Sequence, residues 1–420
     1  MTSREKVLGA FEHRDMSAVP VDFSAHRSSG ISPIAYARLR DHLGLPRREI
    51  RVYDPIQQLA VVDADVLDRF GIDAVELGRA FAVDGKDWQP WTLPDGSPCA
   101  MPVWVKLERQ AGAWAMRSVS GAVIGRMPDG ALYFEQSSFP FAESDDLDAI
   151  PRAFEECMWT SSVAAAPPGP LTAGPDGAHR LKEGAARLRA STDRAIVGLF
   201  GGNLLEIGQF LYRNDNFFML LAGEPARAEA FLDRVVELHL ANLERFLGAV
   251  GESIDIVLFG DDLGMQTGPQ ISPDMYRRFF KPRHAAMWRR AKELAPAGRG
   301  GDTNRPPVRV MLHCCGGVRE LLPDLIDAGL DAINPVQVTC TGMEPGGLKR
   351  DFGRDLVFWG GGCDTREVLP YGTPGQVRDH VRRQVEILAC DGGFVFQQVH
   401  NIQANVPAAN IEAMFDAVRG

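Results

Sequence analysis

Four residues in the last part of the chain carry side chains that bind metals: His313, Cys315, Cys363 and His400. The first two belong to the stretch VRVMLHCCGGVREL, in which an aliphatic run ends in His-Cys-Cys-Gly-Gly and becomes helix-like. Residues i and i+2 of a strand point to the same side, so His313 and Cys315 can face one site while Cys314 faces away. Zinc prefers nitrogen and sulfur ligands, and Cys363 and His400 could complete a tetrahedron from neighbouring strands.

These residues also have a structural interpretation. A single His or Cys at the end of a strand usually serves packing, and this applies to each of them taken alone. An H-x-C at one strand end, with a Cys and a His at two others, is harder to explain by packing. Gly316 and Gly317 allow the backbone to turn tightly into a helix whose N-terminus favours a thiolate. The residue pattern by itself leaves both interpretations open.

Other polar residues end the neighbouring predicted strands. Asp261 and Asp262 precede His313 in the chain, and they can cap a helix, orient a metal-bound imidazole or act as catalytic proton contacts. Asn334 and Gln337 end the following strand and could bind substrate, although a buried polar strand end often only satisfies backbone groups. In a barrel the loops after the strands carry the chemistry, so we expect these side chains to converge on one rim.

Eight short aliphatic runs supply the strands that would position these residues. They alternate with helical patterns, and such apolar runs are typical of strands buried on both faces of a parallel sheet. The alternation predicts a (β/α)₈ TIM barrel. The alternative is an open doubly wound sheet, and the absence of a G-x-G-x-x-G motif after the first strand argues against it. The predicted strands span 19–23, 73–78, 195–202, 254–262, 308–315, 331–337, 356–364 and 394–401, with helices at 223–249, 272–293, 317–328 and 374–389.

The segment 85–140 interrupts this alternation. It contains Pro-Asp-Gly twice, and Asp-Gly between runs rich in apolar and β-branched residues is typical of a hairpin. We expect a small antiparallel β insertion at one end of the barrel, followed by a Pro/Ala/Gly-rich linker near 164–178. The prediction is therefore a single TIM-barrel domain over residues 1–420 that carries this insertion.

Composition narrows the partners and the compartment. The 420 residues are 45% hydrophobic and 24% charged, which is typical of a soluble globular protein, and the formal net charge of −10 argues against nucleic acid or an anionic membrane as partner. No uninterrupted apolar run is long enough for a membrane span, and the opening MTSREKVLGAFEH is typical of an amphipathic helix with a Thr2–Glu5 capping box, not of a signal peptide. The seven cysteines are odd in number and indicate reduced thiols in a cytoplasm.

The chain resembles one known family over nearly its whole length. It is similar to the uroporphyrinogen decarboxylase superfamily, especially its corrinoid-dependent methyltransferase branch, in its opening, SREKVLGAFEHRDMSAVPVDF, and in several later blocks. These blocks are ISPDMYRRFFKPRHAAM, LHCCGGVRELLPDLIDAGLDAINPVQ, LVFWGGGCDTREVLPYGTPGQVRDHV and VHNIQANVPAANIEAMFDAV. The resemblance implies a TIM barrel.

Within this superfamily the motifs differ from those of the decarboxylase itself. The decarboxylase has an Arg-rich R-Q-A-G-R-Y segment that grips the substrate's propionates, whereas this chain has DFSAHRSSGISPIAY there. The H-x-C-G of His313, Cys315 and Gly316 resembles the zinc motif of methylcobalamin:thiol methyltransferases, whose site is closed by a further Cys at the last strand. This chain has His400 there and Cys363 one strand earlier. His313 and Cys315 thus carry over from the family, while Cys363 and His400 are placed by their strand-end positions.

The resemblance implies a zinc-dependent methyltransferase. Zn²⁺ would activate a small acceptor, a thiol, to take a methyl group from methylcobalamin on a separate corrinoid protein. The direction of transfer, the acceptor and the residue that completes the metal site stay open, and tetrahydrofolate fits the same residues. The alternatives are a metal-independent, decarboxylase-like lyase in which Asp261 or Asp262 contacts the substrate, and a non-enzymatic module that binds a metal or a corrinoid protein.

Overall fold

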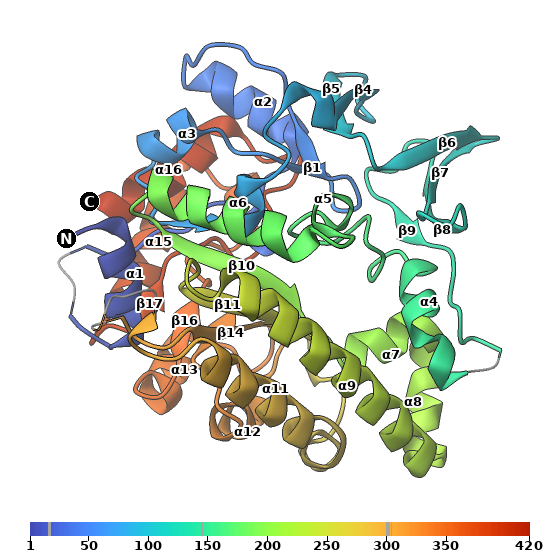
Figure 1. The fold of residues 1–420 in the computed structure, drawn as a ribbon. Coiled ribbons are helices and arrows are strands. Elements are labelled where there is room, and N and C mark those ends of the chain that lie inside the picture. The colour runs from blue at the N-terminus through green and yellow to red at the C-terminus, as the bar shows by residue number, and fades with distance from the viewer. Residues whose placement is uncertain (16–17, 144–145, 300–302, 304) are drawn as a thin grey trace.

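The centre of the molecule is a curled sheet of seven parallel strands in the order β17-β16-β15-β14-β11-β10-β3 (Figure 1). The structure is a computed structural model that describes residues 1–15, 18–143, 146–299, 303 and 305–420. The strands are buried on both faces, as their continuous apolar runs predicted. They are β3 (Ala74–Glu76), β10 (Ala195–Gly201), β11 (Ile256–Gly260), β14 (Arg309–His313), β15 (Ala332–Asn334), β16 (Val357–Trp359) and β17 (Phe394–Val395).

Residues around Val21 lie where an eighth strand was expected. Val21 forms an isolated parallel bridge with Phe396, just beyond β17, and its carbonyl accepts a hydrogen bond from the backbone N–H of Asp73, just before β3. The pairing of this segment does not extend into a longer ladder, because the chain turns at Ser24, which has a φ of 67°. The expectation of a complete eight-stranded barrel was therefore wrong in this respect. The described residues form a curled, TIM-like half-barrel, not a closed barrel.

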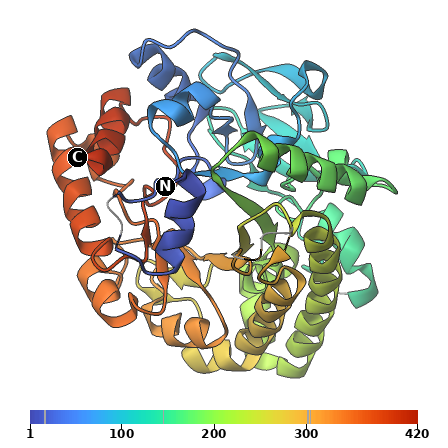
Figure 2. The ribbon, with the colours of Figure 1, turned by 60° about the vertical axis from the view of Figure 1, so that its left-hand side comes forward.

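Helices surround the curled sheet on its outer side (Figure 2). The helix predicted at 272–293 is interrupted by a π-helical turn, Tyr276–Phe280, because Pro282 has no N–H to continue the α-helical ladder. The longer helices are α1 (Ser3–Phe11), α2 (Pro33–His42), α6 (Gly177–Ser191), α7 (Leu205–Tyr212), α8 (Asn214–Gly223), α9 (Pro225–Val250), α11 (Lys281–Leu294), α13 (Pro345–Phe352), α15 (Pro374–Leu388) and α16 (Ala408–Arg419). The shorter helices are α3 (Ala64–Arg69), α4 (Ile150–Glu155), α5 (Gly169–Thr172), α10 (Pro273–Met275), α12 (Leu322–Asp327) and α14 (Val368–Tyr371).

Antiparallel strands fill the chain between β3 and α4. A two-stranded ladder pairs β4 (Trp88–Thr92) with β5 (Pro98–Pro102), and a four-stranded sheet follows in the order β6-β7-β8-β9. The latter strands are β6 (Lys106–Gln110), β7 (Ala113–Arg117), β8 (Val123–Pro128) and β9 (Glu135–Gln136). They lie on the side toward which the arrow of β10 points, and away from both termini (Figure 1). The strands expected from the Asp-Gly turns thus lie beyond the carboxyl end of the parallel sheet.

Two smaller ladders lie outside the parallel sheet and the insertion. The strand β1 (Val52–Asp54) pairs with β2 (Leu59–Ala60), and β12 (Gly264–Met265) pairs with β13 (Gly268–Pro269), both antiparallel. A separate hydrophobic cluster packs β1 against the insertion through residues that include Val52, Trp91 and Met116. The insertion therefore has an apolar core of its own that also contacts the region around β1.

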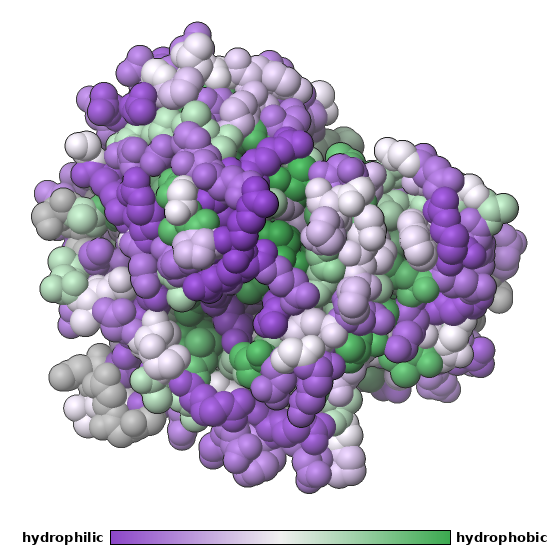
Figure 3. All heavy atoms as spheres, turned by 90° about the horizontal axis from the view of Figure 1, so that it is seen from above, coloured by the Kyte–Doolittle hydropathy of each residue, from purple (hydrophilic) through white to green (hydrophobic). Residues whose placement is uncertain are grey.

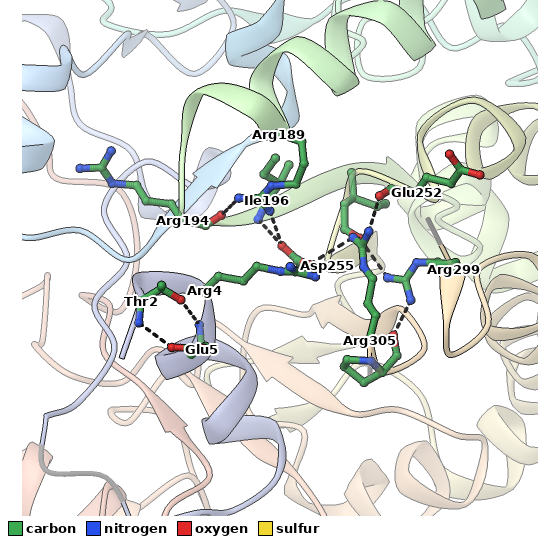
Figure 4. A network of polar contacts seen from close by, with 12 residues as sticks. Thr2, Arg4, Glu5, Arg189, Arg194, Ile196, Glu252, Asp255, Arg299 and Arg305 are labelled. Atoms are coloured by element: carbon green, nitrogen blue, oxygen red, sulfur yellow. Dashed lines mark hydrogen bonds and ion pairs between the residues drawn. The ribbon is translucent and has the colours of Figure 1, made fainter. Parts of the chain in front are cut away.

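Asp255 organises a buried ionic network at the amino end of the sheet (Figure 4). Its side chain is 1% exposed and lies 2.8 Å from Arg4 Nε, 3.0 Å from Arg189 Nη1 and 3.3 Å from Arg305 Nη2. It also accepts the backbone N–H of Ile196, the second residue of β10, at 3.0 Å. The network joins the N-terminal helix, α6 and two strands at the end of the sheet opposite to the loops that carry the predicted site.

The surface in Figure 3 is mostly hydrophilic, and hydrophobic residues appear mainly in recesses between the larger left-hand part and the smaller right-hand part. This distribution agrees with the charged composition of the chain. Among the described residues, no helix has both the length and the apolar character needed to cross a bilayer.

Candidate metal centre and its cavity

Three of the four predicted metal ligands come together at the carboxyl end of the sheet. One ligand atom from each of His313, Cys315 and His400 lies within 4.8 Å of the other two. Cys315 Sγ is 3.4 Å from His313 Nε2, and the centroids of the two imidazole rings are 5.7 Å apart. Two imidazole nitrogens and one sulfur fit the donor preference of Zn²⁺, and three protein ligands leave a fourth position for a substrate.

His313 is oriented by its neighbour in the adjacent strand. It ends β14, and its Cα is paired in register with that of Asn334, which ends β15. The amide nitrogen of Asn334 donates to the carbonyl of Trp359 and to Gln397 Oε1, each at 2.8 Å, so its Oδ1 faces His313 Nδ1 at 2.8 Å as an acceptor. His313 therefore holds its proton on Nδ1 and presents the Nε2 lone pair to Cys315.

A buried polar chain holds Asn334 in turn. Ser28 Oγ donates to Asn334 Oδ1 at 2.8 Å and lies 3.1 Å from His26 Nδ1. His26 Nε2 lies 3.2 Å from Asp22 Oδ2. Outer contacts of this kind fix the orientation of a metal ligand. The contacts of Asn334 thus place it behind His313 as a positioning residue. Substrate binding by Asn334 stays a prediction.

Cys314 and Cys315 point to opposite sides, as the strand period predicted. Cys314 is buried in the hydrophobic core, where its Sγ accepts the backbone N–H of Leu263 at 3.2 Å. The backbone N–H of Cys315 donates to Asp262 Oδ1 at 2.7 Å. Burial and the nearby Asp262 carboxylate raise the pKa of the Cys315 thiol well above its ordinary value. Cys315 is therefore a neutral thiol in the protein alone, and a coordinated cation would be needed to ionise it.

His400 is present as a neutral imidazole, because burial lowers its pKa to about 3. Its Nδ1 accepts the backbone N–H of Asn401 at 2.9 Å, so the neutral ring carries its proton on Nε2. To bind a metal, His400 would have to exchange this hydrogen bond or move its proton. His313 is already in a ligating tautomer. The two histidines are thus not equivalent.

Cys363 does not join this group. The strand predicted at 356–364 ends at Trp359, and Gly360 and Gly361 then take positive φ values of 125° and 75°. Beyond them Cys363 forms an isolated parallel bridge with Gln398, and its side chain is buried in the hydrophobic core, with its Sγ 3.8 Å from the carbonyl of Asp364. Burial raises the pKa of this thiol far above its ordinary value. The structure therefore gives no support to Cys363 as a ligand.

The adjacent aspartates have different surroundings. Asp261 is fully buried and accepts the backbone N–H groups of Leu205 and Glu206, each at 3.0 Å, at the start of α7. This is the helix-capping role that the sequence left open. Asp262 is 32% exposed, lines the cavity described below, and has its Oδ1 3.8 Å from His313 Nε2. Of the two predicted catalytic residues, Asp262 is the one placed to act on a ligand.

Gln337 supports the loop that follows Cys315. Its Oε1 accepts the backbone N–H of Gly316 at 2.6 Å and lies 3.5 Å from Cys340 Sγ. Neither contact points to a substrate, and the predicted substrate-binding role of Gln337 stays a prediction. The side chain instead holds the turn that carries the H-x-C-G motif.

Glu206 is a cavity residue that the sequence patterns do not single out. It lies in the first turn of α7 and not at a strand end. The one feature of the sequence that could have pointed to Glu206 is its position four residues after Gly202, which follows β10. Its Oε2 accepts Asn203 Nδ2 at 2.6 Å and the backbone N–H of Asp262 at 3.0 Å. Burial, with the charges of Asp262 and Asp261, raises its pKa well above the ordinary value. Glu206 is thus a proton-bearing acid beside an exposed carboxylate.

A cavity of about 580 Å³ lies beside the three candidate ligands, and we call it the metal-site cavity. His313, His400, Asp262 and Glu206 all line it. Its volume is in the range of small-molecule sites. Much of the remaining wall is aromatic and comes from Phe154, Trp159, Phe200, Phe210 and Phe259. A cluster of donor atoms beside a cavity with apolar walls is able to bind a metal and a small substrate together.

Comparison with known proteins establishes the family. Residues 207–420, about half of the chain, match the family model of uroporphyrinogen decarboxylase (URO-D). The chain belongs to the URO-D family. The matched segment contains His313, Cys315 and His400, so all three candidate ligands lie in the part of the chain that defines its membership. The membership expected from the sequence blocks is confirmed.

A solved structure has the same overall fold as this URO-D family member. A methyltransferase from Methanosarcina mazei superposes with a TM-score of 0.57 over 100% of this chain and 98% of its own, at 17% sequence identity. At this identity the likeness establishes the fold. The search among curated proteins found none that matches the chain.

Proposed function

We propose that this URO-D family member is a zinc-dependent methyltransferase. It would move a methyl group between a corrinoid, methylcobalamin on a partner protein, and a small acceptor, for which we propose a thiol. The observation that carries the proposal is the grouping of His313, Cys315 and His400 within 4.8 Å beside the metal-site cavity. The H-x-C-G motif and the fold shared with a methyltransferase from Methanosarcina mazei support it.

The donor set suits the activation of a thiol. Two neutral imidazoles and one thiolate carry a single negative charge, so a divalent cation would keep net positive charge toward the fourth position. Zn²⁺ in this place would lower the pKa of a bound acceptor thiol, so that a thiolate is present at neutral pH. His313 is preset for ligation by Asn334, and the proton on its Nδ1 remains fixed while Nε2 binds.

Asp262 would take up the proton that the acceptor loses. Asp262 is the carboxylate nearest to His313, at 3.8 Å, and it is accessible from the metal-site cavity. It can accept a proton from an entering thiol. Glu206 Oε2 accepts the backbone N–H of Asp262, so Glu206 would hold the Asp262 backbone in place beside the metal-site cavity.

The aromatic wall of the metal-site cavity would keep water away from the reacting thiolate. Trp159 and Phe210 are stacked with their ring centroids 6.0 Å apart, and Phe200 packs edge-on against Phe259 at 5.4 Å. Exclusion of water strengthens the electrostatic contacts in the site and protects a nucleophile from hydration. The corrinoid of the partner protein would dock at the opening of this cavity, since the methyl group has to reach the fourth position.

Metal analysis with a matched cysteine variant tests the proposal. Wild-type protein should contain about one zinc per chain, Cys315→Ala should lose it, and Cys314→Ala should keep it, since Cys314 faces the core. The same samples are then mixed with methylcobalamin and a small thiol, and the change in the corrinoid absorbance is followed. Equal zinc in wild type and Cys315→Ala would show that the ligand assignment is wrong. Full zinc content without any methyl transfer to thiols would contradict the proposed reaction but would still support the metal site.

A further inference from the structure

A second cavity, of about 250 Å³, lies between the insertion and the parallel sheet, and we call it the insertion cavity. Its walls come from β1, the end of β3, the ladder of β4 and β5, and the linker segment 163–168. Arg27 and residues 164–166 line both this cavity and the metal-site cavity, so they form the partition between the two. The insertion and the linker thus line a second space, and the proposed function assigns no role to this space.

Two buried polar groups in the insertion cavity lack partners. Glu76 ends β3 and is 5% exposed, and its Oε1 has no hydrogen-bond partner among the described residues. The hydroxyl of Tyr53 in β1 is likewise buried and unpaired within the part of the chain that the structure describes. Buried polar atoms in native proteins are nearly always hydrogen-bonded, because an unpaired one is destabilising. Two such groups lining one cavity indicate that a ligand supplies the missing bonds.

The side walls of the insertion cavity are aromatic and fixed. Trp88, Trp104 and Phe81 line it. The indole N–H of Trp88 donates to the carbonyl of Ala82 at 2.8 Å, and the guanidinium of Arg51 lies 5.1 Å from the centroid of the Trp88 ring. Flat walls of this kind favour a planar ligand, which can stack on the ring faces. The volume limits such a ligand to one or two fused rings.

The charges around the cavity argue against a cationic ligand. Three guanidinium groups line the space, those of Arg27, Arg51 and Arg79, and Arg27 Nε lies 3.2 Å from Asp54 Oδ2. These cations would repel an ammonium group despite the aromatic walls. A neutral planar molecule avoids this repulsion, and Arg51, which is partly exposed, can bind an anionic substituent at its edge.

We infer that the insertion cavity binds a planar nitrogen heterocycle whose edge presents a ring nitrogen beside an exocyclic amino group, as in aminopyrimidines, purines and pterins. Such an edge forms two parallel hydrogen bonds with the carboxyl group of Glu76, and the Tyr53 hydroxyl binds a further ring heteroatom. Burial raises the pKa of the Tyr53 hydroxyl, so this group keeps its proton and acts as a donor. Burial likewise raises the pKa of Glu76, so its carboxyl group can donate one hydrogen bond to the ring nitrogen while it accepts one from the amino group.

A matched pair of probes tests this assignment by isothermal titration calorimetry. 2-Aminopyrimidine carries an exocyclic amino group beside a ring nitrogen, and pyrimidine has the same ring without the amino group. We expect 2-aminopyrimidine to bind wild-type protein about tenfold more tightly than pyrimidine, or better, because pyrimidine lacks the hydrogen bond from the amino group to the carboxyl group of Glu76. Equal binding of the two probes, or binding of neither at millimolar concentration, would overturn the proposal.

Two variants then locate the binding. Glu76→Leu should abolish the preference for 2-aminopyrimidine and should raise the melting temperature, because it removes an unpaired buried carboxyl group. Gly78→Ala leaves the carboxyl in place but puts a methyl group 3.3 Å from Glu76 Oε1, and it should weaken the binding of 2-aminopyrimidine. Both variants should keep the zinc of the metal-site cavity. A preference for 2-aminopyrimidine that survives in both variants would show that the probe binds elsewhere.

Discussion

His313 Nδ1 lies 2.8 Å from Asn334 Oδ1, and the two residues end neighbouring strands in register. The contact fixes the imidazole tautomer, because both protons of the Asn334 amide are already donated to other acceptors. The nitrogen that faces Cys315 is therefore ready for a metal before any metal arrives. This relationship supports the first prediction.

Asn334→Leu should weaken zinc binding by about 10–100-fold, since the imidazole loses the acceptor that selects its tautomer. The measurement is competition with a chelator of known affinity. Asn410→Leu is the matched control, because Asn410 is also a buried amide that donates to two carbonyls, of Leu369 and Gly372, but in helix α16. Both variants should lose stability, and only Asn334→Leu should lose zinc affinity. Equal zinc affinity in the two variants would contradict a positioning role of Asn334.

His400→Ala and Cys363→Ala should separate the two residues that the sequence offered as the last ligand. His400→Ala removes one of the three candidate zinc ligands and should reduce zinc affinity more than about 100-fold. This is more than the loss expected when a residue that only contacts a ligand is removed. Cys363→Ala replaces a buried thiol outside the group and should keep zinc while losing about 1 kcal/mol of stability. Chelator competition and thermal melting measure the two effects. Loss of zinc in Cys363→Ala alone would reverse the assignment.

Much of the site follows from the sequence because the alternation of side chains along a strand is a local property. The alternation of residues in β14 is enough to place His313 and Cys315 on one side and Cys314 in the core. The turn after them also follows, because Gly316 has a φ of 90° and a Cβ there would lie 2.3 Å from the backbone of Gly264. Parallel strands then bring His400 from the last strand to the same rim.

The structure differs from the expectations where tertiary packing decides. An apolar run ending in Gly-Gly-Gly does not reveal that β16 stops at Trp359 and that Cys363 forms an isolated parallel bridge with Gln398, with its side chain in the core. The run around Val21 has the composition of a strand, but it pairs through a single bridge because the chain turns at Ser24. Glu206 lies on a helix, and only the folded chain shows that its side chain lies beside Asp262. Long-range contacts of this kind leave no periodic pattern in the sequence.

Glu206→Gln should make folding stability less dependent on pH. Burial raises the pKa of Glu206 in the folded protein, so the folded chain keeps a proton that the unfolded chain releases above its ordinary pKa of 4.5. The folded state then binds more protons, and stability falls as the pH rises from about 4.5 toward the raised value. A glutamine side chain does not ionise, so the variant avoids this loss of stability and should have a higher melting temperature at neutral pH.

Thermal melts from about pH 4.5 to neutral pH measure the difference, with Glu237→Gln on the exposed side of α9 as control. Parallel profiles for wild type and Glu206→Gln would exclude a raised pKa.

Asp255→Asn should destabilise the fold by about 3 kcal/mol without affecting the metal site. The variant leaves the guanidinium groups of Arg4, Arg189 and Arg305 around a neutral side chain, and removing one partner of a buried ionic group is strongly destabilising. The network lies at the amino end of β10 and β11, and the metal ligands lie at the carboxyl end of the sheet. Denaturant unfolding should therefore show a lower midpoint while zinc content stays unchanged. Asp233→Asn is the control, since its pair with Arg283 is largely exposed on the Asp233 side and should contribute less than about 1 kcal/mol. A similar loss in both variants would mean that the network around Asp255 stabilises no more than a surface ion pair.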